Sequence, residues 1–404
     1  MNIWTVIILF AIGGFALLLL RAERLLNDSH MLFFAASVIA LAMAVRVLCM
    51  DYKTLDYINF LSQWVDYFRN NGGWRALSRS IGNYNIPYLY FLALFSYIDI
   101  PDLYLIKLLS ILFDVILAWS SMKLVGVFTG SSNKRLFTFL VVLFLPTVVL
   151  NGALWGQCDS IYTAFAVMSL WLALDGKPKL SMAAIAASFA FKLQAVFVMP
   201  IFLAFLYTGR IKFRHFFIFP LTYIVLMLPA VAFGRPLAET FTLYFHQAGS
   251  VGSALNYNSP SVFAYVRDAA NIDLFSRLGI GAAFAFMSLV LYWLYIRREH
   301  VTDMILLAAA LLLSVGIPFL LPHMHDRYFF MADILTLVFA VIAPRYFPLP
   351  LLTSFASLLG YHAYLKMRYL LPMSYGATAL IFVISLVFLY IFAALSHRRR
   401  YKAR

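Results

Sequence analysis

The chain has 404 residues, of which 64% are hydrophobic and only 12% are charged, and its mean hydropathy is +0.87. A soluble globular chain usually has about 45–50% apolar and about 25% charged residues. This composition excludes a soluble enzyme, a disordered chain and a DNA-binding domain. It predicts an all-α polytopic membrane protein.

The 31 Lys and Arg residues outnumber the 17 Asp and Glu residues, which gives a formal net charge of +14. The basic residues lie in short loops between apolar runs, as the positive-inside rule describes. No basic stripe with interleaved stacking aromatics lies outside those runs, so we expect no nucleic-acid partner. Cys49 and Cys158, at the ends of apolar runs, fit neither a disulfide framework nor a metal cluster.

The first apolar run, 3–20, is followed by Arg21 and Arg24, so we interpret it as a retained helix rather than a cleaved signal peptide. Later runs approach the ~20 residues needed to cross ~30 Å of hydrocarbon. They are 31–50, 103–127, 136–150, 159–173, 216–233, 278–296, 301–321, 329–343, 349–363 and 371–395. Run 87–98 is shorter. Run 180–207 has basic flanks on both sides and predicts two short helices that meet near Lys192.

The basic clusters are expected on the inner side of the membrane. Two polar loops, 51–85 and 234–275, are expected on the outer side. The clusters are 21–24, 134–135, 177–179, 210–214, 297–298 and a tail at 396–404. With these sides assigned, the number of membrane crossings between 87 and 135 does not match by one. We therefore expect about 11–13 membrane helices in one integral membrane domain, 1–404. In a prokaryote this would be the plasma (inner) membrane, with the polar loops facing the periplasm or exterior.

Ionisable groups beside a membrane domain usually mark function, and four clusters carry them. In the first, Asp51 and Asp56 lie among apolar residues near helical spacing, which predicts an amphipathic helix on the outer interface. The two carboxylates would either solvate that helix or form part of a site. In the second, Gln157 precedes Asp159, which could cap the next helix or bind a ligand, and the two roles are compatible.

The third cluster contains Lys192 and Gln194; Lys192 either extends its amine to the interface as an anchor or points into a cavity. The fourth, residues 322–328, reads Pro-His-Met-His-Asp-Arg-Tyr. Its His-x-His suggests zinc, but no third Cys or His is nearby, and its arginine suits a phosphate. All four clusters fall on one side, so they predict an outward-facing polar cavity. Asp114 lies within the long apolar run 103–127, and we assign no role to it.

These clusters resemble motifs of the GT-C superfamily of polytopic glycosyltransferases, most closely the bacterial mannosyltransferases related to GPI mannosyltransferase 2. The matching segments, in order, are Asp56-Tyr-x-x-Phe60-x-x-x-Trp64, Asn83-Tyr84-Asn-Ile-Pro87-Tyr-Leu-Tyr90, Trp155-Gly-Gln157-Cys-Asp159-Ser160, Phe191-Lys192-Leu-Gln194-Ala195 and Pro322-His323-Met-His325-Asp326-Arg327-Tyr328. Asn83 replaces a frequent Asp and Asp326 replaces the usual Glu. An Asp-x-Asp pair seen in some superfamily loops is absent, so a divalent metal stays an open alternative and no other cofactor is expected.

The resemblance implies an inverting transfer of a hexose, with mannose as the candidate, from a polyprenyl-phosphate-sugar donor to a lipid-linked or cell-surface glycan. Asp56 would be the general base. The donor phosphate would be bound by Arg327, His325, Lys192 and Arg46. Sugar and acceptor groups would contact Gln157, Asp159, Gln194, Asp51, Asn83, Tyr84, His323 and Asp326. Membrane lipids are further expected partners.

Two other functions fit an outward-facing polar cavity. The first is a transporter or flippase of a lipid-linked or anionic sugar, although no inverted repeat of the kind common in transporters is found in the sequence. The second is a membrane scaffold without catalytic activity, which gives no reason for the fourth cluster to face Asp56.

Overall fold

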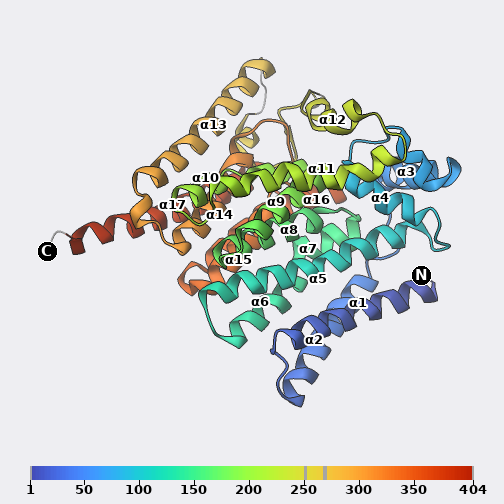
Figure 1. Ribbon diagram of the computed structural model, residues 1–404, viewed down its shortest axis with the longest axis horizontal. Helices are drawn as coiled ribbons and strands as arrows, with labels where there is room; N and C mark the ends of the chain where they lie inside the picture. The colour runs from blue at the N-terminus through green and yellow to red at the C-terminus, as the bar shows by residue number, and fades with distance from the viewer. Residues whose placement is uncertain (1, 250–252, 267–270, 403–404) are drawn as a thin grey trace.

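The computed structural model describes residues 2–249, 253–266 and 271–402, and these residues are almost entirely helical (Figure 1). Among them, seven helices are long and apolar enough to span a membrane, and a helix pair bent by 48° makes an eighth span if it is counted as one. The prediction of an all-α polytopic membrane protein is confirmed. Seven or eight span-length helices are fewer than the 11–13 expected, because several of the expected spans form helices of only 10–17 residues in the described part of the chain. Parts of the expected loop 234–275 and of the basic tail lie outside the described residues.

The long helices are α1 (Ile3–Ala22), α2 (Ser29–Val47), α5 (Asp102–Phe128), α11 (Ile218–Ala232), α13 (Ile272–Ile296), α14 (Asp303–Leu320) and α17 (Met373–Lys402). The other α-helices are α3 (Ser62–Asn70), α4 (Ile86–Phe95), α6 (Ser132–Phe144), α7 (Pro146–Val149), α8 (Asp159–Leu174), α9 (Pro178–Phe191), α10 (Ile201–Tyr207), α12 (Leu237–Gly249), α15 (Phe330–Ile342) and α16 (Pro348–Leu365).

Short π-helical and 3₁₀ segments connect these helices. The π-helical segments are η1 (Tyr57–Leu61) and η3 (Leu150–Trp155), and the 3₁₀ segments are η2 (Gly73–Ser78), η4 (Leu193–Phe197), η5 (Phe213–Phe217), η6 (Val262–Tyr265), η7 (Arg298–His300) and η8 (Pro344–Tyr346). Strands β1 (Asn256–Tyr257) and β2 (Met324–His325) pair in parallel. This two-residue pairing matters because β2 is part of the fourth polar cluster.

Burial separates an interior from a periphery in the bundle. Within their most apolar windows, α14 is 83% buried and α5 is 78% buried, whereas the window over η5 and α11 is 17% buried and that of α13 is 22% buried. Helices that are apolar all round are expected in the interior of a bundle or facing lipid. Figure 1 shows α13 lying at the edge of the molecule and α1 with α2 at another edge. The polar clusters are therefore held by the buried helices.

The bundle has two ends that differ in their polar contacts. At one, which we call the Glu23 end, Glu23 pairs with Lys123 at 2.9 Å and with Arg135 at 2.6 Å, which joins the α1–α2 loop to the last turns of α5 and the start of α6. The other, the Asp56 end, holds the first turn of α5, where the Tyr57 hydroxyl donates to Asp102 at 3.2 Å. Helix α5 thus runs from the Asp56 end to the Glu23 end.

Helix α4 begins and ends at the Asp56 end. The Asn85 amide before it donates to the Ala190 carbonyl at 2.8 Å, close to the break between α9 and η4. After it, the Tyr97 hydroxyl accepts from the Trp74 backbone N–H at 3.1 Å, and the Trp74 ring stacks on Phe233 at the end of α11. Ten residues reach only ~15 Å. The run 87–98 therefore does not cross, and the crossing that the basic clusters left unbalanced disappears.

Two of the expected spans are broken. The run 136–150 is split between α6 and α7 where Pro146, which has no backbone N–H, begins a new helix. The run 180–207 is split between α9 and η4, where Lys192 has extended backbone angles of −154° and 134°. The prediction of two short helices that meet near Lys192 is confirmed. At the second break, the Lys192 side chain is directed to the buried Asp159.

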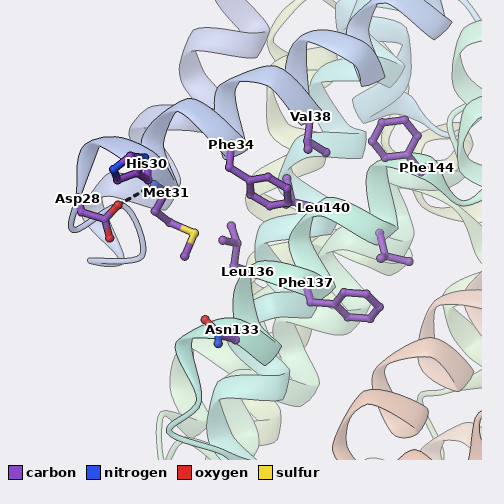
Figure 2. Close-up of a pocket in the computed structure, with 11 residues that line it drawn as sticks. Asp28, His30, Met31, Phe34, Val38, Asn133, Leu136, Phe137, Leu140 and Phe144 are labelled. Atoms are coloured by element: carbon purple, nitrogen blue, oxygen red, sulfur yellow. Dashed lines mark hydrogen bonds between the residues drawn. The ribbon is translucent and has the colours of Figure 1, made fainter.

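An apolar groove of about 890 Å³ lies between α2 and α6, at the Glu23 end (Figure 2). Phe34 and Val38 of α2 face Leu140 and Phe144 of α6 across it, and Asp28 lies at its polar end. The groove is lined by apolar side chains along most of its length. It is thus separate from the polar clusters, which lie at the Asp56 end.

A buried ion pair joins three of the helices, α2, α5 and α6. The Arg46 guanidinium donates to Asp114 at 2.8 and 3.2 Å and to the carbonyls of Ala42 and Leu143 at 3.1 and 2.9 Å, and both charged side chains are fully buried. Asp114 also accepts from the Ser160 hydroxyl. A buried charge is tolerated only when it is paired and hydrogen-bonded. Arg46 and Asp114 therefore fix α2 to α5 and α6.

We expect Arg46→Leu to destabilise the fold by about 3–5 kcal/mol, because it leaves the Asp114 charge buried without its partner. The double variant Arg46→Leu with Asp114→Leu should recover most of this loss, since no unpaired charge remains. The measurement is the unfolding temperature of the three proteins in detergent. A single variant as stable as the wild type, or a double variant no better than the single, would contradict this role.

Candidate functional site

The carboxylate of Asp56 accepts hydrogen bonds from two residues of the second cluster. Its Oδ2 receives the indole N–H of Trp155 at 2.9 Å and the amide N–H of Gln157 at 2.8 Å. The Tyr84 hydroxyl donates to the other atom of that amide, Oε1, at 2.7 Å. Tyr84 therefore orients Gln157 so that its donor faces Asp56. Both donors meet the same oxygen, so they hold the Asp56 carboxylate in one orientation.

The backbone turn at Gly156 makes these contacts possible. Trp155 ends η3, and Gly156 has a φ of +78°, in the left-handed region that glycine adopts without steric cost. The next residues, Gln157 and Cys158, lead directly into α8. The turn thus directs Trp155 and Gln157 to the same carboxylate through the three-residue connection 156–158 between η3 and α8.

Tyr364, at the end of α16, completes the surroundings of Asp56. Its hydroxyl accepts the Asp56 backbone N–H at 3.0 Å, and its ring stacks on Trp155 with centroids 4.0 Å apart and planes 11° apart. The sequence analysis missed this residue, because it is a single tyrosine just beyond the expected span 349–363. No pattern in the sequence distinguishes it from the other 23 tyrosines of the chain.

The second and third clusters meet in a buried ion pair. Lys192 Nζ lies 2.5 Å from Asp159 Oδ1, and the Asn151 amide donates to Asp159 Oδ2 at 2.8 Å. Lys192 and Asp159 are both buried, so Lys192 points into the bundle and does not extend to the interface. Asp159 is the first residue of α8, whose cap is Cys158, and its carboxylate is used by these partners rather than as the helix cap.

Arg327 lies among three carboxylates without a close hydrogen bond to any of them. Its guanidinium nitrogens are 3.8 Å from Asp56, 3.7 Å from Asp159 and 3.6 Å from Asp326, and its centre lies 5.2 Å from the Trp155 ring. Distances above 3.5 Å are ion pairs rather than hydrogen bonds. Arg327 Nε is buried without a hydrogen-bond partner among the described residues. The guanidinium therefore keeps donors for an anion, which it can bind in a bidentate way.

The strand pairing and a close helix approach position this cluster. Asn256 and Tyr257 pair with Met324 and His325, just before Asp326. On the other side, a Cβ at Gly360 of α16 would lie 3.0 Å from the Asp326 carbonyl oxygen and 2.8 Å from that of Asn258. Only a glycine lets α16 pack this closely. The loop that carries Arg327 is thus held between β1 and α16.

Burial changes the charge states of two neighbours of Arg327. Burial raises the pKa of Asp326 to about 7, although Arg327 opposes the shift. Burial, together with the positive charges of Arg327 and Lys192, lowers the pKa of His325 to about 4. His325 is therefore neutral at pH 7. It stacks on Tyr257 with centroids 4.7 Å apart, and it brings no positive charge to a phosphate.

Gln194 and Tyr84 also belong to the cluster. Gln194 interacts with the hydroxyl of Tyr328, the residue after Arg327, and its Oε1 is buried without a hydrogen-bond partner among the residues described. Lys192 Nζ lies 5.9 Å from the Tyr84 ring centre. An unsatisfied buried acceptor beside Lys192 is suited to a hydroxyl donor of a ligand.

The remaining sequence-predicted site residues lie elsewhere. Arg46 is saturated by Asp114 and two carbonyls, so it cannot reach a phosphate. His323 adopts a φ of +60°, and its ring lies 2.7 Å from the Ala254 carbonyl and 3.1 Å from the Ser276 hydroxyl, which makes it a link between segments. Asp51 is exposed and accepts from the Tyr104 hydroxyl at 2.6 Å. Asn83 is exposed, whereas Asn85 of the same motif is buried.

The amphipathic first loop is confirmed in part. Leu61, Trp64 and Val65 of the expected apolar face pack into the core, whereas Leu55, Ile58 and Phe60 are exposed. The π-helical turn of η1 directly follows Asp56, and such turns occur often at functional sites.

Cys49 and Cys158 are free thiols, and no group of three His, Cys, Asp or Glu residues suited to a metal ion occurs within 2–249, 253–266 and 271–402. No protein-family model matches the chain, and no curated protein matches it in sequence. The geometry of the cluster therefore carries the functional argument.

The pKa of Asp326 gives a test of its burial. A folded-state pKa of about 7, above the ordinary value of 3.8, means that ionising Asp326 destabilises the fold as the pH rises between these values. We expect the unfolding temperature of the wild type to fall relative to that of Asp326→Asn over this range. The comparison with His325→Gln should show the opposite pH dependence. The lowered pKa of His325 means that the wild-type protein loses stability relative to this variant as the pH falls from 6.5 toward about 4. Parallel pH curves for wild type and Asp326→Asn would contradict this burial.

Proposed function

We propose that this protein is an inverting membrane glycosyltransferase that uses a polyprenyl-phosphate-sugar donor. The observation that carries the proposal is the position of Asp56. The Asp56 carboxylate, held by Trp155 and Gln157, lies 3.8 Å from an arginine that keeps free donors for an anion. A base beside an anion site is the pair that transfer from a sugar phosphate needs.

In the proposed reaction, an acceptor hydroxyl oxygen attacks the anomeric carbon of the donor from the side opposite the phosphate. Asp56 Oδ1 or Oδ2 takes the hydroxyl proton as the new carbon–oxygen bond forms. The bond between the anomeric carbon and the phosphate oxygen breaks, and its electron pair leaves with the lipid phosphate. Configuration at the anomeric carbon is inverted.

The leaving phosphate needs charge stabilisation rather than a strong acid. Arg327 would bind it through the donors that no carboxylate occupies, and Lys192 would add a second positive charge. Gln194 Oε1 would accept a sugar hydroxyl. The resemblance to the GT-C superfamily supports a hexose, with mannose as the candidate, a lipid-linked or cell-surface glycan as acceptor, and the external face of a plasma membrane as the site of reaction. A divalent metal remains compatible with the proposal.

A transporter or flippase of a lipid-linked or anionic sugar is the second candidate. The observation that favours it is the pair of broken spans at Pro146 and Lys192, since transporters often bind substrates at discontinuous helices. Their sites usually lie near the bilayer midplane, whereas this cluster lies at the Asp56 end of the bundle. Movement of a labelled lipid across vesicles without covalent transfer would favour this candidate.

Asp56→Asn should lower sugar transfer by about 10²–10⁴-fold, because it keeps the size of the side chain but removes the base. The assay is transfer of radiolabelled hexose from a set of polyprenyl-phosphate-hexoses. Asp66→Asn is the matched control, since Asp66 is exposed and pairs with Arg69 in the same loop region. Equal transfer by wild type and Asp56→Asn would rule out Asp56 as the base.

A further inference from the structure

Two loops meet beside Asp56 on the surface of the molecule. One follows α2 and carries Lys53, three residues before Asp56. The other joins α16 to α17 and carries Lys366 and Arg368. The Tyr52 hydroxyl donates to the Leu365 carbonyl at 3.5 Å, which joins the two loops. Tyr364, the residue before Leu365, accepts a hydrogen bond from the Asp56 backbone N–H, so both loops border the Asp56 carboxylate.

The second loop is also tied to the segment that carries Arg327. The Tyr369 hydroxyl donates to Asn258 Oδ1 at 2.7 Å, and Asn258 forms a backbone bridge with His325. The loop 366–372 therefore extends from the Asp56 side of the cluster to the Arg327 side. It forms part of the border of the site rather than a distant surface.

The cations of these loops have no side-chain partner among the described residues. Lys53, Lys366 and Arg368 are exposed, and within the described part of the chain none of them forms an ion pair or a side-chain hydrogen bond. The two carboxylates nearest in sequence are used by other donors, Asp51 by Tyr104 and Asp56 by Trp155 and Gln157.

The same loops also carry exposed apolar side chains. Leu48 is 85% exposed, Met367 72% and Leu370 65%, although all three lie in loops beyond the ends of the helices. Apolar side chains next to lysine and arginine are typical of segments that lie at a membrane interface and attract anionic lipids. Unpartnered positive charge with an apolar border is complementary to a lipid that carries a phosphate.

We propose that Lys53, Lys366 and Arg368 form a cationic rim that binds the phosphate of a polyprenyl-phosphate lipid at the membrane interface before it reaches Arg327. The proposal rests on the proposed function for the identity of the lipid. It adds a binding step outside the catalytic cluster, in which the apolar residues contact the hydrocarbon chain and the rim contacts the phosphate. The catalytic cations are occupied in part by carboxylates, whereas the rim cations are not.

The test measures binding of undecaprenyl phosphate to the full chain in phosphatidylcholine nanodiscs, by native mass spectrometry or by a titration. Each cation near the interface is expected to contribute about a 5-fold gain in affinity, so the double variant Lys366→Gln with Arg368→Gln should bind about 25-fold more weakly. High salt should reduce this difference, because the rim is exposed. Arg75→Gln, which removes an exposed cation in η2 at the same end of the bundle, should bind like the wild type.

Several outcomes would overturn the rim. They are wild-type affinity in the double variant, an equal loss in Arg75→Gln, and displacement of the lipid by inorganic phosphate, which would assign the rim to a free anion. Binding does not require sugar transfer, so the two proposals fail separately. Loss of affinity in the double variant together with full transfer by Asp56→Asn would keep the rim and remove the proposed base. Normal affinity in the double variant with no transfer by Asp56→Asn would keep the proposed base and remove the rim.

Discussion

The guanidinium of Arg327 lies among three carboxylates, and the rest of the Asp56 end is arranged around this charge. In a low-dielectric interior, an unpaired charge is very costly, so Arg327 requires carboxylates nearby. Asp56, Asp159 and Asp326 supply them from three separate parts of the chain. Lys192 then balances Asp159. Bringing these segments together requires the bundle to converge on one point.

Breaks in the helices make this convergence possible. A continuous helix would satisfy its own backbone and direct its side chains around a full circle, so few of them could face one point. The break at Lys192, the turn at Gly156 and the π-helical turn after Asp56 each interrupt regular structure at residues of the cluster. Irregular backbone at membrane depth is tolerated where it is buried in protein or lines a polar cavity.

Two buried arginines show how the same chemistry serves structure in one place and binding in another. Arg46 donates four hydrogen bonds of 2.8–3.2 Å to Asp114, Ala42 and Leu143. Arg327 meets its carboxylates only at 3.6–3.8 Å. A saturated pair holds helices together and has nothing left for a ligand. A loosely paired guanidinium retains donors, and this difference in geometry assigns Arg327, and not Arg46, to the candidate site.

Composition alone determined the class of this protein, because the bilayer requires long apolar helices and leaves a strong signal in the sequence. The charged and amide residues of the cluster, including Asp56, Gln157, Asp159, Lys192 and Arg327, were also predictable, since a polar residue in so apolar a chain stands out. Tertiary structure decided their partners. It removed Arg46 and His323 from the site, and it added Tyr364, because contacts between residues more than a hundred positions apart depend on packing that leaves no local pattern. It also showed that both ends of α4 lie at the Asp56 end, since the sequence of the run 87–98 does not reveal which segments its two ends contact.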